Sequence, residues 1–374
     1  MLAVGGGHQI ELICFEFNNW SKVNNDSLIK CLSNVKIIKI EAGRKHFFKW
    51  GWSMFTEKFY RFAGLYLPIR ETVLSQAISR RSNLLIQELN KVSKPDWVIG
   101  HNPGAMLPTL IAAKKFNCKA GFDVEDYHSE EGMDKKLQML TKKLMVNLLP
   151  QFNYVSFAAP LILEQVKVDV VIESAPWFTV LNYFSKSEFY EPLNLGIGPV
   201  KMVWFSQNIN AGRGLELILP FVKQNCFTVE LHLIGNLNQD FHEHNLRNFD
   251  NIIFHLPMQQ SELHKILAQF DIGLALDIPV DRNRDLAITN KLLAYLQAGL
   301  YVIATETSAQ KDFLNDWQHH GTTFNYTINN FQSIVEDIID KIDIIRKEKD
   351  ARFKAFNNNN WETASIQLLN QWNN

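Results

Sequence analysis

Residues 284–307 place a polar turn, an amphipathic helix and a buried strand in immediate succession. Gly299 stands where a helix ends in a left-handed residue, after an apolar helical face made of Leu292, Leu293, Tyr295 and Leu296. Residues 300–304 are apolar and rich in β-branched side chains, which is typical of a strand covered on both faces. A helix that feeds directly into such a strand predicts a parallel α/β sheet.

Three polar residues, Thr289, Asn290 and Lys291, begin this helix. Free backbone N–H groups and the helix dipole favour an anion at that place. The lysine among them indicates a phosphate group as the ligand.

The rest of the chain alternates strand-like and helix-like segments, which predicts parallel sheets with helices on both faces. A length of 374 residues favours two domains over one. We place their boundary in a stretch rich in proline, glycine and charge, residues 185–200. The expected strands are 8–15, 35–40, 97–100, 119–123, 155–158, 170–172, 201–206, 230–234, 252–255, 272–276 and 300–304, and the expected helices are 75–92, 104–116, 215–223, 261–269 and 362–372.

Composition excludes several classes of protein. A net charge of −1 gives no overall field for nucleic acid or membrane. The four cysteines are scattered without metal-binding spacing, which favours reduced thiols in the cytoplasm. No apolar run approaches the roughly 20 residues of a membrane helix, and the first residues do not resemble a signal peptide.

A second phosphate motif lies at residues 204–218, where we expect a strand to end at Ser206 and a helix to begin near Gly214. The glycine-containing loop directs backbone N–H groups at an anion, and Arg213 adds bidentate contacts. The alternative is an ordinary connection with a surface arginine. The pairing with Asn290 and Lys291 in the same half favours a phosphate site.

The first half places polar residues just after two strands. His101 follows strand 97–100, at the sheet edge where open α/β folds bind ligands. Asp123, Glu125 and Asp126 come at the end of the next strand, and Asp126 is our best candidate for a ligand contact. Two alternatives stay open: caps for the following helix, and a metal site, which the absence of a D-x-D pattern disfavours.

Residues 43–81 interleave cations with aromatic residues, and only Glu57 and Glu71 oppose that charge before Arg80. Such a stretch is suited to an anionic membrane or a lipid-linked acceptor. Equally, it is compatible with a core helix whose exposed face carries the cations. No recognised nucleic-acid module accompanies it, so we expect no nucleic-acid partner.

In their order along the chain, these motifs resemble the retaining glycosyltransferases of family 4. That family has the GT-B fold, in which two Rossmann-like doubly wound parallel-sheet domains face each other across a cleft. The resemblance runs from about His8 to Trp372. It implies an acceptor-side domain (1–190), a donor domain (191–356) and a C-terminal helix (357–374) that crosses back to the first domain. The family's first strand, loop and helix have no counterpart before His8, which favours a truncated start.

The resemblance implies a catalytic role for His101, which would touch the transferred sugar, and for Asp126, which would orient sugar and acceptor. It also implies a set of residues that bind the donor: Gln207, Arg213, Gly214, Asp285, Asn290 and Lys291. Departures from the family occur within this set. Gln207 replaces an arginine, and two glutamates are replaced by Leu286 and Ala294, for which Asp285 and Asn290 are the expected substitutes.

The implied activity is transfer of a sugar from a UDP- or GDP-sugar to a glycan or lipid-linked acceptor, in surface polysaccharide or glycoconjugate biosynthesis. Retention of configuration and independence of metals and other cofactors are further expectations, with a hinge near residues 193–198. The location would be the cytoplasm, with the inner face of the membrane as a site of association. The main alternative is a degenerate, non-catalytic binding or scaffold protein with the same fold. An epimerase or phosphorylase is a third reading, and we find no lysine segment suited to pyridoxal phosphate.

Overall fold

The chain forms two compact α/β units. The computed structural model describes residues 7–16, 29, 32, 34–41, 47–67, 70–171, 175–193, 196–328 and 330–373, without the side chains of residues 47–50 and 52–53. Unit 1 comprises Met1–Val180 with Ser365–Asn374, and unit 2 comprises Leu181–Ala364. The chain therefore enters unit 2 ten residues before the boundary expected from the sequence, and only its last helix returns to unit 1.

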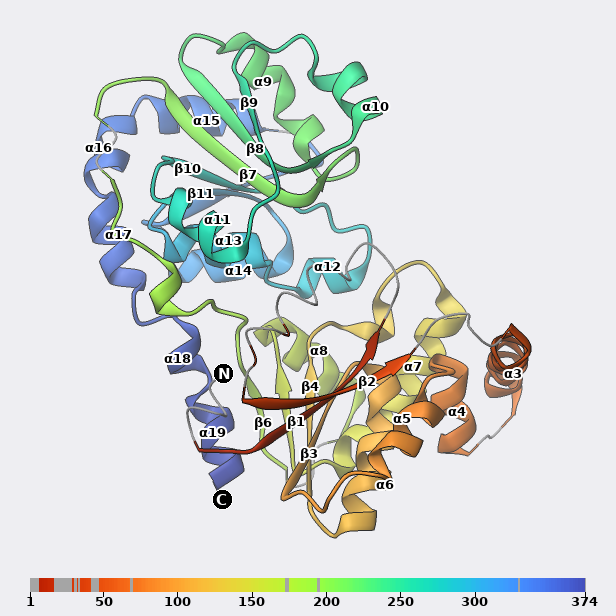
Figure 1. Ribbon diagram of the computed structural model, residues 1–374. Helices are drawn as coiled ribbons and strands as arrows, with labels where there is room; N and C mark the ends of the chain where they lie inside the picture. Colours follow the sequence, from red (N-terminus) through yellow and green to blue (C-terminus); the bar gives the residue numbers. More distant parts are fainter. Residues whose placement is uncertain are drawn as a thin grey trace. The chain divides into compact units, whose positions relative to one another are not determined.

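Unit 2 contains a six-stranded parallel sheet (Figure 1). Its strands are β7 (Val200–Ile209), β8 (Val229–Leu237), β9 (Ile252–His255), β10 (Ile272–Ala275), β11 (Tyr301–Thr305) and β12 (Gly321–Phe324), in the order β12-β11-β10-β7-β8-β9. Strands β8 and β9 follow β7 on one side of it, and strands β10, β11 and β12 follow on the other side. This is the strand order of the Rossmann fold, and its reversal point lies between β7 and β10.

Both faces of the unit 2 sheet are covered, since successive residues of β7 belong to different hydrophobic clusters. Met202 and Trp204 belong to one hydrophobic cluster, whereas Val203 belongs to the other. The helices that cover the two faces and extend the unit are α9 (Leu219–Gln224), α10 (Gln239–Phe241), α11 (Gln260–Leu267), α12 (Arg282–Leu286), α13 (Asn290–Gln297), α14 (Ser308–Asp316), α15 (Phe331–Ile339), α16 (Ile342–Lys347), α17 (Lys349–Phe356) and α18 (Trp361–Ala364).

The helix and strand expected in residues 284–307 are confirmed. Helix α13 ends at Gly299, whose φ is 75°. The N–H groups of Gly299 and Leu300 donate to the carbonyls of Leu296 and Tyr295 at 3.0 Å each, which closes the helix in a Schellman motif. The expected loop before it contains the short helix α12, which is capped by the Asp281 carboxylate.

Unit 1 contains a four-stranded parallel sheet in the order β3-β4-β5-β6 and a separate parallel pair, β1 (Ile10–Glu16) with β2 (Val35–Glu41). The four strands are β3 (Trp97–His101), β4 (Lys119–Val124), β5 (Tyr154–Phe157) and β6 (Trp177–Thr179). The helices are α3 (Phe47–Tyr66), α4 (Glu71–Ile78), α5 (Ser82–Leu89), α6 (Met106–Phe116), α7 (Lys135–Leu148), α8 (Pro160–Asp169) and α19 (Ile366–Asn373).

Strand register places the chemistry of unit 1 on one face of its sheet. His101 pairs with Asp123, and Asp123 pairs with Ser156, so these three side chains share a face at the carboxyl ends of β3, β4 and β5. Helix α19 reaches the same face. The Trp372 indole donates to the Tyr154 hydroxyl at 3.2 Å, and the Trp97 indole donates to the Trp372 carbonyl at 3.3 Å.

Four expected elements differ from the structure. The helices expected over 215–223 and 362–372 are each interrupted, the first at Ile218 between a 3-10 turn (Leu215–Leu217) and α9, the second at Ser365 between α18 and α19. The helix expected over 75–92 is two helices, α4 and α5, because the chain turns at Ser79, where Gly104 packs so closely that a Cβ on it would lie 2.7 Å from the Ser79 side chain. No strand forms at Val170 and Val171, which follow α8, and the fourth strand begins at Trp177 instead. Residue 172 lies outside the described residues, as do residues 194 and 195 of the expected hinge. Among the described helices, none combines the length and apolar character needed to span a membrane.

Candidate active site

The reversal point of the unit 2 sheet carries a loop built on glycine. After β7, Gly212 and Gly214 adopt φ angles of 74° and 85°, which only glycine adopts readily. A Cβ on Gly214 would lie 2.8 Å from the carbonyl oxygen and Cβ of Leu276, so the loop rests directly on the end of β10. Arg213 stands between the two glycines and is exposed. An ordinary side chain at residue 214 would push the loop off this edge.

Lys291 forms an ion pair at the same edge. It occupies the first turn of α13, and its Nζ lies 3.2 Å from Oδ1 of Asp277, two residues beyond β10. Both side chains are largely buried, with 15% and 22% exposure. The backbone N–H of Asp277 donates to Thr305 Oγ1 at 2.9 Å, which ties this loop to the end of β11. Thus α13 directs a lysine, and not only its N–H groups, toward the carboxyl ends of β10 and β11.

Asp277 also carries an unsatisfied acceptor. Its Oδ2 is buried and has no hydrogen-bond partner among the described residues. Buried polar atoms are normally paired, by protein, water or ligand. This oxygen is therefore suited to accept a hydrogen bond from a ligand hydroxyl. Sequence reasoning missed Asp277, although it follows a buried strand closely, as His101 does.

The other predicted donor-binding residues differ in their surroundings. Gln207 is exposed within β7, which continues to Ile209 and not only to Ser206, and its carbonyl accepts from Asn236 at 2.8 Å. Asn290 is exposed at the first position of α13. Asp285 is already engaged: its Oδ1 accepts from the Ser308 N–H and its Oδ2 from the Ser308 hydroxyl, both at 2.8 Å, and Arg282 lies 2.5 Å from Oδ2. Asp285 therefore joins α12 to the start of α14.

The two positions where the family has glutamates lie in the core. Leu286 is 2% exposed and Ala294 is 0% exposed, within the apolar surroundings of α12 and α13. A carboxylate at residue 294 would need to be desolvated among Leu292, Tyr295 and Leu296. The ribose contact expected from the family is thus absent at this position. Asp277 is better suited than Asp285 to replace the missing glutamate, because one carboxylate oxygen of Asp277 has no hydrogen-bond partner among the described residues.

In unit 1, His101 meets two carboxylates. Its Nδ1 lies 3.3 Å from Asp123 Oδ2 and 3.3 Å from Glu125 Oε1. Asp123 in turn accepts a short hydrogen bond from the Ser156 hydroxyl on the neighbouring strand. Because carboxylates only accept, Nδ1 carries the proton in the neutral ring, and Nε2 is the acceptor. Half of the His101 side chain is exposed, so a ligand hydroxyl can reach the ring.

The same contacts shift the three pKa values. Burial lowers the pKa of His101, but the hydrogen bond to Glu125 and the charges of Asp123 and Glu125 outweigh burial and raise it. The His101 hydrogen bond lowers the pKa of Glu125. Burial raises the pKa of Asp123, with His101 and Ser156 opposing that rise. The two carboxylates therefore stabilise the protonated form of the His101 ring more than water does, which raises its pKa.

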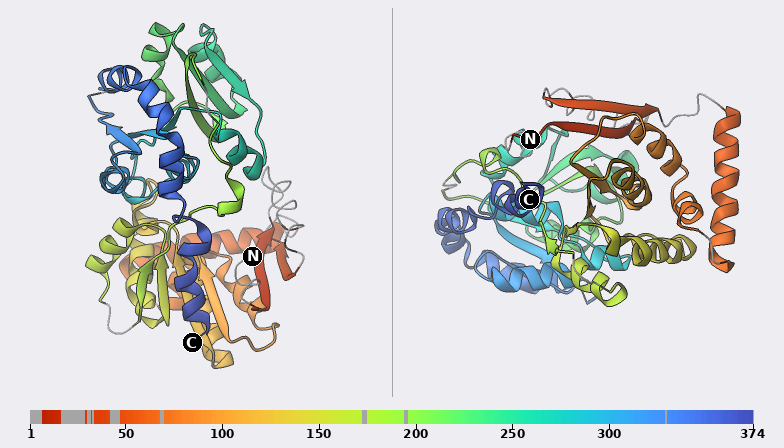
Figure 2. Two further views of the ribbon diagram at one scale, coloured as in Figure 1. Left: turned by 90° about the vertical axis from the view of Figure 1, so that its left-hand side faces the viewer. Right: turned by 90° about the horizontal axis from the view of Figure 1, so that it is seen from below.

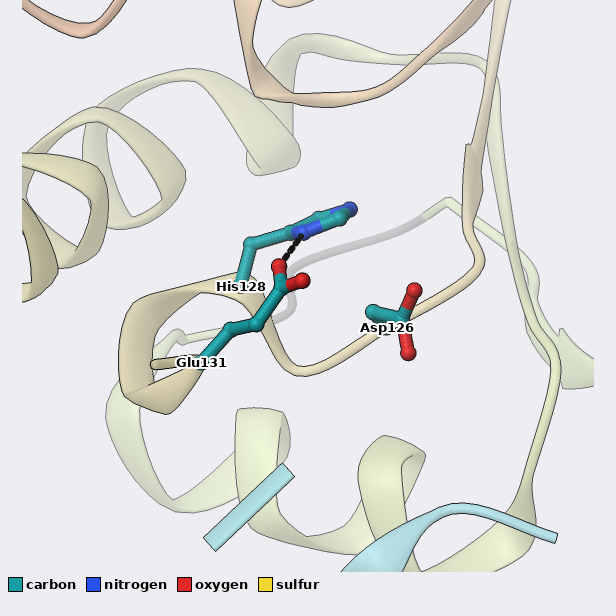
Figure 3. Close-up of side chains that lie close together, drawn as sticks. All are labelled: Asp126, His128 and Glu131. Carbon is teal, nitrogen blue, oxygen red and sulfur yellow. Dashed lines mark hydrogen bonds and ion pairs between the residues drawn. The ribbon is translucent and has the colours of Figure 1, made fainter. Parts of the chain in front are cut away.

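Asp126 belongs to a second group. Its carboxylate lies beside His128 and Glu131, and one ligand atom from each of these three residues lies within 4.8 Å of the others (Figure 3). His128 Nδ1 already contacts Glu131 Oε2 at 2.7 Å. The carboxylates at His101 are Asp123 and Glu125, and the predicted catalytic role of Asp126 stays a prediction. None of the three acidic residues caps α7, because the cap of that helix is Asp134, which accepts from Lys136 and Leu137.

The architecture defines the class of fold. Two α/β units with parallel sheets, one in Rossmann order, form the GT-B fold of glycosyltransferases, as solved structures similar to this chain show. HepE from Anabaena matches with a TM-score of 0.64 and 10% identity, covering 97% of this chain and 99% of that chain. Sucrose-phosphate synthase from Thermosynechococcus elongatus matches with 0.63 and 12%, covering 97% and 98%.

TarM matches with a TM-score of 0.59 and 14% identity over 78% of this chain, and the chain spans 58% of the length of TarM. No protein-family profile matches the sequence. No protein of curated function matches it by sequence either. The likeness to known proteins is therefore one of fold.

Proposed function

We propose that the chain is a glycosyltransferase that moves a sugar from a nucleotide-diphosphate sugar to a hydroxyl group. The observation that carries this proposal is the carboxyl edge of unit 2, where the Gly212–Gly214 loop, Arg213 and Lys291 meet at the reversal point of a Rossmann sheet. Support comes from similar solved structures: HepE and TarM were each solved with UDP, and a trehalose-6-phosphate structure from E. coli with UDP-2-fluoro glucose.

In this proposal the cations of unit 2 stabilise charge on the leaving diphosphate, which is the main electrostatic task of the reaction. Arg213 offers a planar fork of donors and Lys291 a point charge beside the N-terminus of α13. Asp277 Oδ2 accepts a hydroxyl of the donor. Gly214 keeps the loop close to β10, so that backbone N–H groups approach the phosphates.

In unit 1, His101 contacts the transferred sugar or the acceptor hydroxyl through Nε2, and Asp123 and Glu125 fix the orientation of the ring. Asp126 is a second candidate for a hydroxyl contact. The acceptor is a glycan or a lipid-linked glycan of surface polysaccharide or glycoconjugate biosynthesis. We also propose that the reaction retains the configuration of the sugar and needs no metal or cofactor. The protein would act in the cytoplasm, at the membrane.

Thermal unfolding with millimolar UDP, GDP and their sugars tests the donor site. We expect one nucleotide to raise the melting temperature, and Lys291→Ala or Arg213→Ala to abolish that rise. The matched control is Lys347→Ala, because Lys347 is exposed next to Arg346, which contacts Asp271 at the opposite end of β10. No shift with any nucleotide would overturn the proposal.

One observation favours a second candidate, a non-catalytic binding protein. The buried Leu286 and Ala294 remove both glutamates that the resembling family uses. A nucleotide-induced shift without hydrolysis or transfer of any sugar tested would identify this alternative. Release of free nucleotide from a UDP- or GDP-sugar, lost in His101→Ala, would exclude it.

A further inference from the structure

Four aromatic side chains of helix α3 face water, whereas a core helix would turn them inward. Phe55, Phe59, Phe62 and Tyr66 recur at intervals of four, three and four residues, so they form one stripe along the helix. Their exposures are 64%, 56%, 65% and 68%. A helix at the surface of a globular protein normally turns its apolar stripe toward the core and its polar residues toward water.

The opposite face of α3 is the one that attaches the helix to unit 1, and it does so through polar contacts. Arg61 pairs with Glu57 at 2.7 Å and donates to the Ala77 carbonyl of α4 at 2.9 Å. Lys143 of α7 donates to the Gly64 carbonyl at 3.0 Å, and Gly64 is buried. The aromatic stripe is therefore on the outer face of the helix. Helix α3 itself lies at the rim of unit 1 (Figure 2).

Charge identifies the partner of this surface. Residues 43–81 carry a net charge of +6, whereas the whole chain carries −1. The cations are Arg44, Lys45, Lys49, Lys58, Arg61, Arg70, Arg80 and Arg81. Lys58 lies next to the stripe and Arg70 follows the helix, and both are exposed. Two copies of such a surface repel each other, whereas an anionic bilayer attracts it and accepts aromatic rings at the headgroup level.

We propose that the outer face of α3, formed by Phe55, Phe59, Phe62 and Tyr66 with Lys58, docks on the surface of a membrane rich in anionic phospholipids. The rings enter the interface and the cations stay among the headgroups, so the helix lies along the membrane and does not cross it. This inference rests on the proposed function only in assigning the acceptor to that membrane.

Sedimentation of the full-length protein with vesicles tests the proposal. We expect binding to vesicles of phosphatidylcholine mixed with phosphatidylglycerol, weak binding to phosphatidylcholine alone, and a decline with added salt. Phe59→Ser with Phe62→Ser should reduce binding to the mixed vesicles at least about tenfold. The matched control is Met139→Ser with Val168→Ser, which removes two exposed apolar residues of α7 and α8 and should leave binding unchanged.

A variant that keeps the aromatic ring should keep vesicle binding. In Phe62→Tyr, binding should therefore stay near the wild-type level. Equal binding by the Phe59/Phe62 double variant and the wild type would overturn the proposal. A wild-type dimer that the double variant abolishes, without vesicle binding, would assign the stripe to self-association and overturn it too. The nucleotide-induced thermal shift measures binding at the proposed site in unit 2, whereas α3 belongs to unit 1. Loss of the shift and loss of vesicle binding are therefore separate outcomes.

Discussion

The carboxyl edges of the two sheets carry opposite charge. In unit 2 the edge presents Arg213 and Lys291, with Asp277 as a partner of the lysine. In unit 1 the edge presents His101 between two carboxylates. The same topological position thus presents cations in one unit and hydrogen-bond acceptors in the other. This difference suits the diphosphate and the hydroxyl groups of the proposed reaction.

The largest expected effect comes from removing the cation at α13. Lys291→Ala should lower turnover of the sugar donor by about 10²-fold or more, because charge that develops on the leaving diphosphate loses a partly buried partner. It also leaves Asp277 unpaired, which would further repel the donor. Steady-state kinetics and nucleotide titration measure this effect, and Lys347→Ala serves as the control. A variant that keeps wild-type turnover would show that the cationic edge of unit 2 is not the donor site.

A change at His101 should lower turnover without affecting nucleotide binding. His101→Phe should lower turnover by about 10²-fold, the usual scale for a positioned histidine, and leave the nucleotide-induced thermal shift intact. The reason is that its contacts lie in unit 1 and the proposed nucleotide site lies in unit 2. Steady-state kinetics with the sugar donor measures turnover, and calorimetric titration with the nucleotide measures binding by the same preparation. Loss of nucleotide binding in this variant would contradict the division of labour between the edges.

The carboxylates around His101 can be tested through its pKa. Glu125→Gln should lower the pKa of His101, since the Glu125 hydrogen bond is the largest contribution that raises it. Glu131→Gln is the control, because Glu131 contacts His128. Nuclear magnetic resonance titration of the histidine side chains gives the values. An unchanged His101 in Glu125→Gln would mean that the two groups do not interact.

The raised pKa also has a consequence for stability, with a definite sign. His101 binds its proton more tightly in the folded state, so its stabilising contribution is complete below the unfolded pKa. That contribution is lost as the pH rises through the raised folded value. The difference in free energy of unfolding between wild type and His101→Phe should therefore shrink with rising pH over this window. Denaturation at several pH values measures it, and a difference that grows with pH would contradict the sign.

The smallest effect should come from Asp285, whose contacts are internal. Asp285→Ala removes the link between α12 and Ser308 and should lower the free energy of unfolding by about 1–3 kcal/mol, as a lost charged hydrogen bond does. Nucleotide affinity should change little. Urea denaturation measures the free energy of unfolding, and nucleotide titration of the same variant measures the affinity. A large loss of affinity at wild-type stability would restore Asp285 as a donor contact.

Much of the fold followed from the sequence because its signals are local. Thr289, Gly299 and the run 300–304 predict a capped helix and a buried strand, and α13 and β11 form there. Likewise, His101 and Asp123 were expected at one sheet edge, and register makes them neighbours.

Other features depend on tertiary contacts and were not predictable in the same way. Gly104 packs against the turn between α4 and α5, and the turn after β4 groups Asp126 with His128 and Glu131. The unsatisfied oxygen of Asp277 depends on where Lys291 and Thr305 lie once the sheet has formed.

Unit 1 is discontinuous in the chain, and this has a consequence for biosynthesis. Its last helix, α19, carries Trp372, which bonds Trp97 and Tyr154 and is made after every residue of unit 2. During translation, unit 2 can fold as one continuous segment, whereas the rings of Trp97 and Tyr154 in unit 1 lack their α19 partner until synthesis ends. A chaperone that binds apolar surface on nascent chains would therefore remain on the earlier-made unit longer than on the later one.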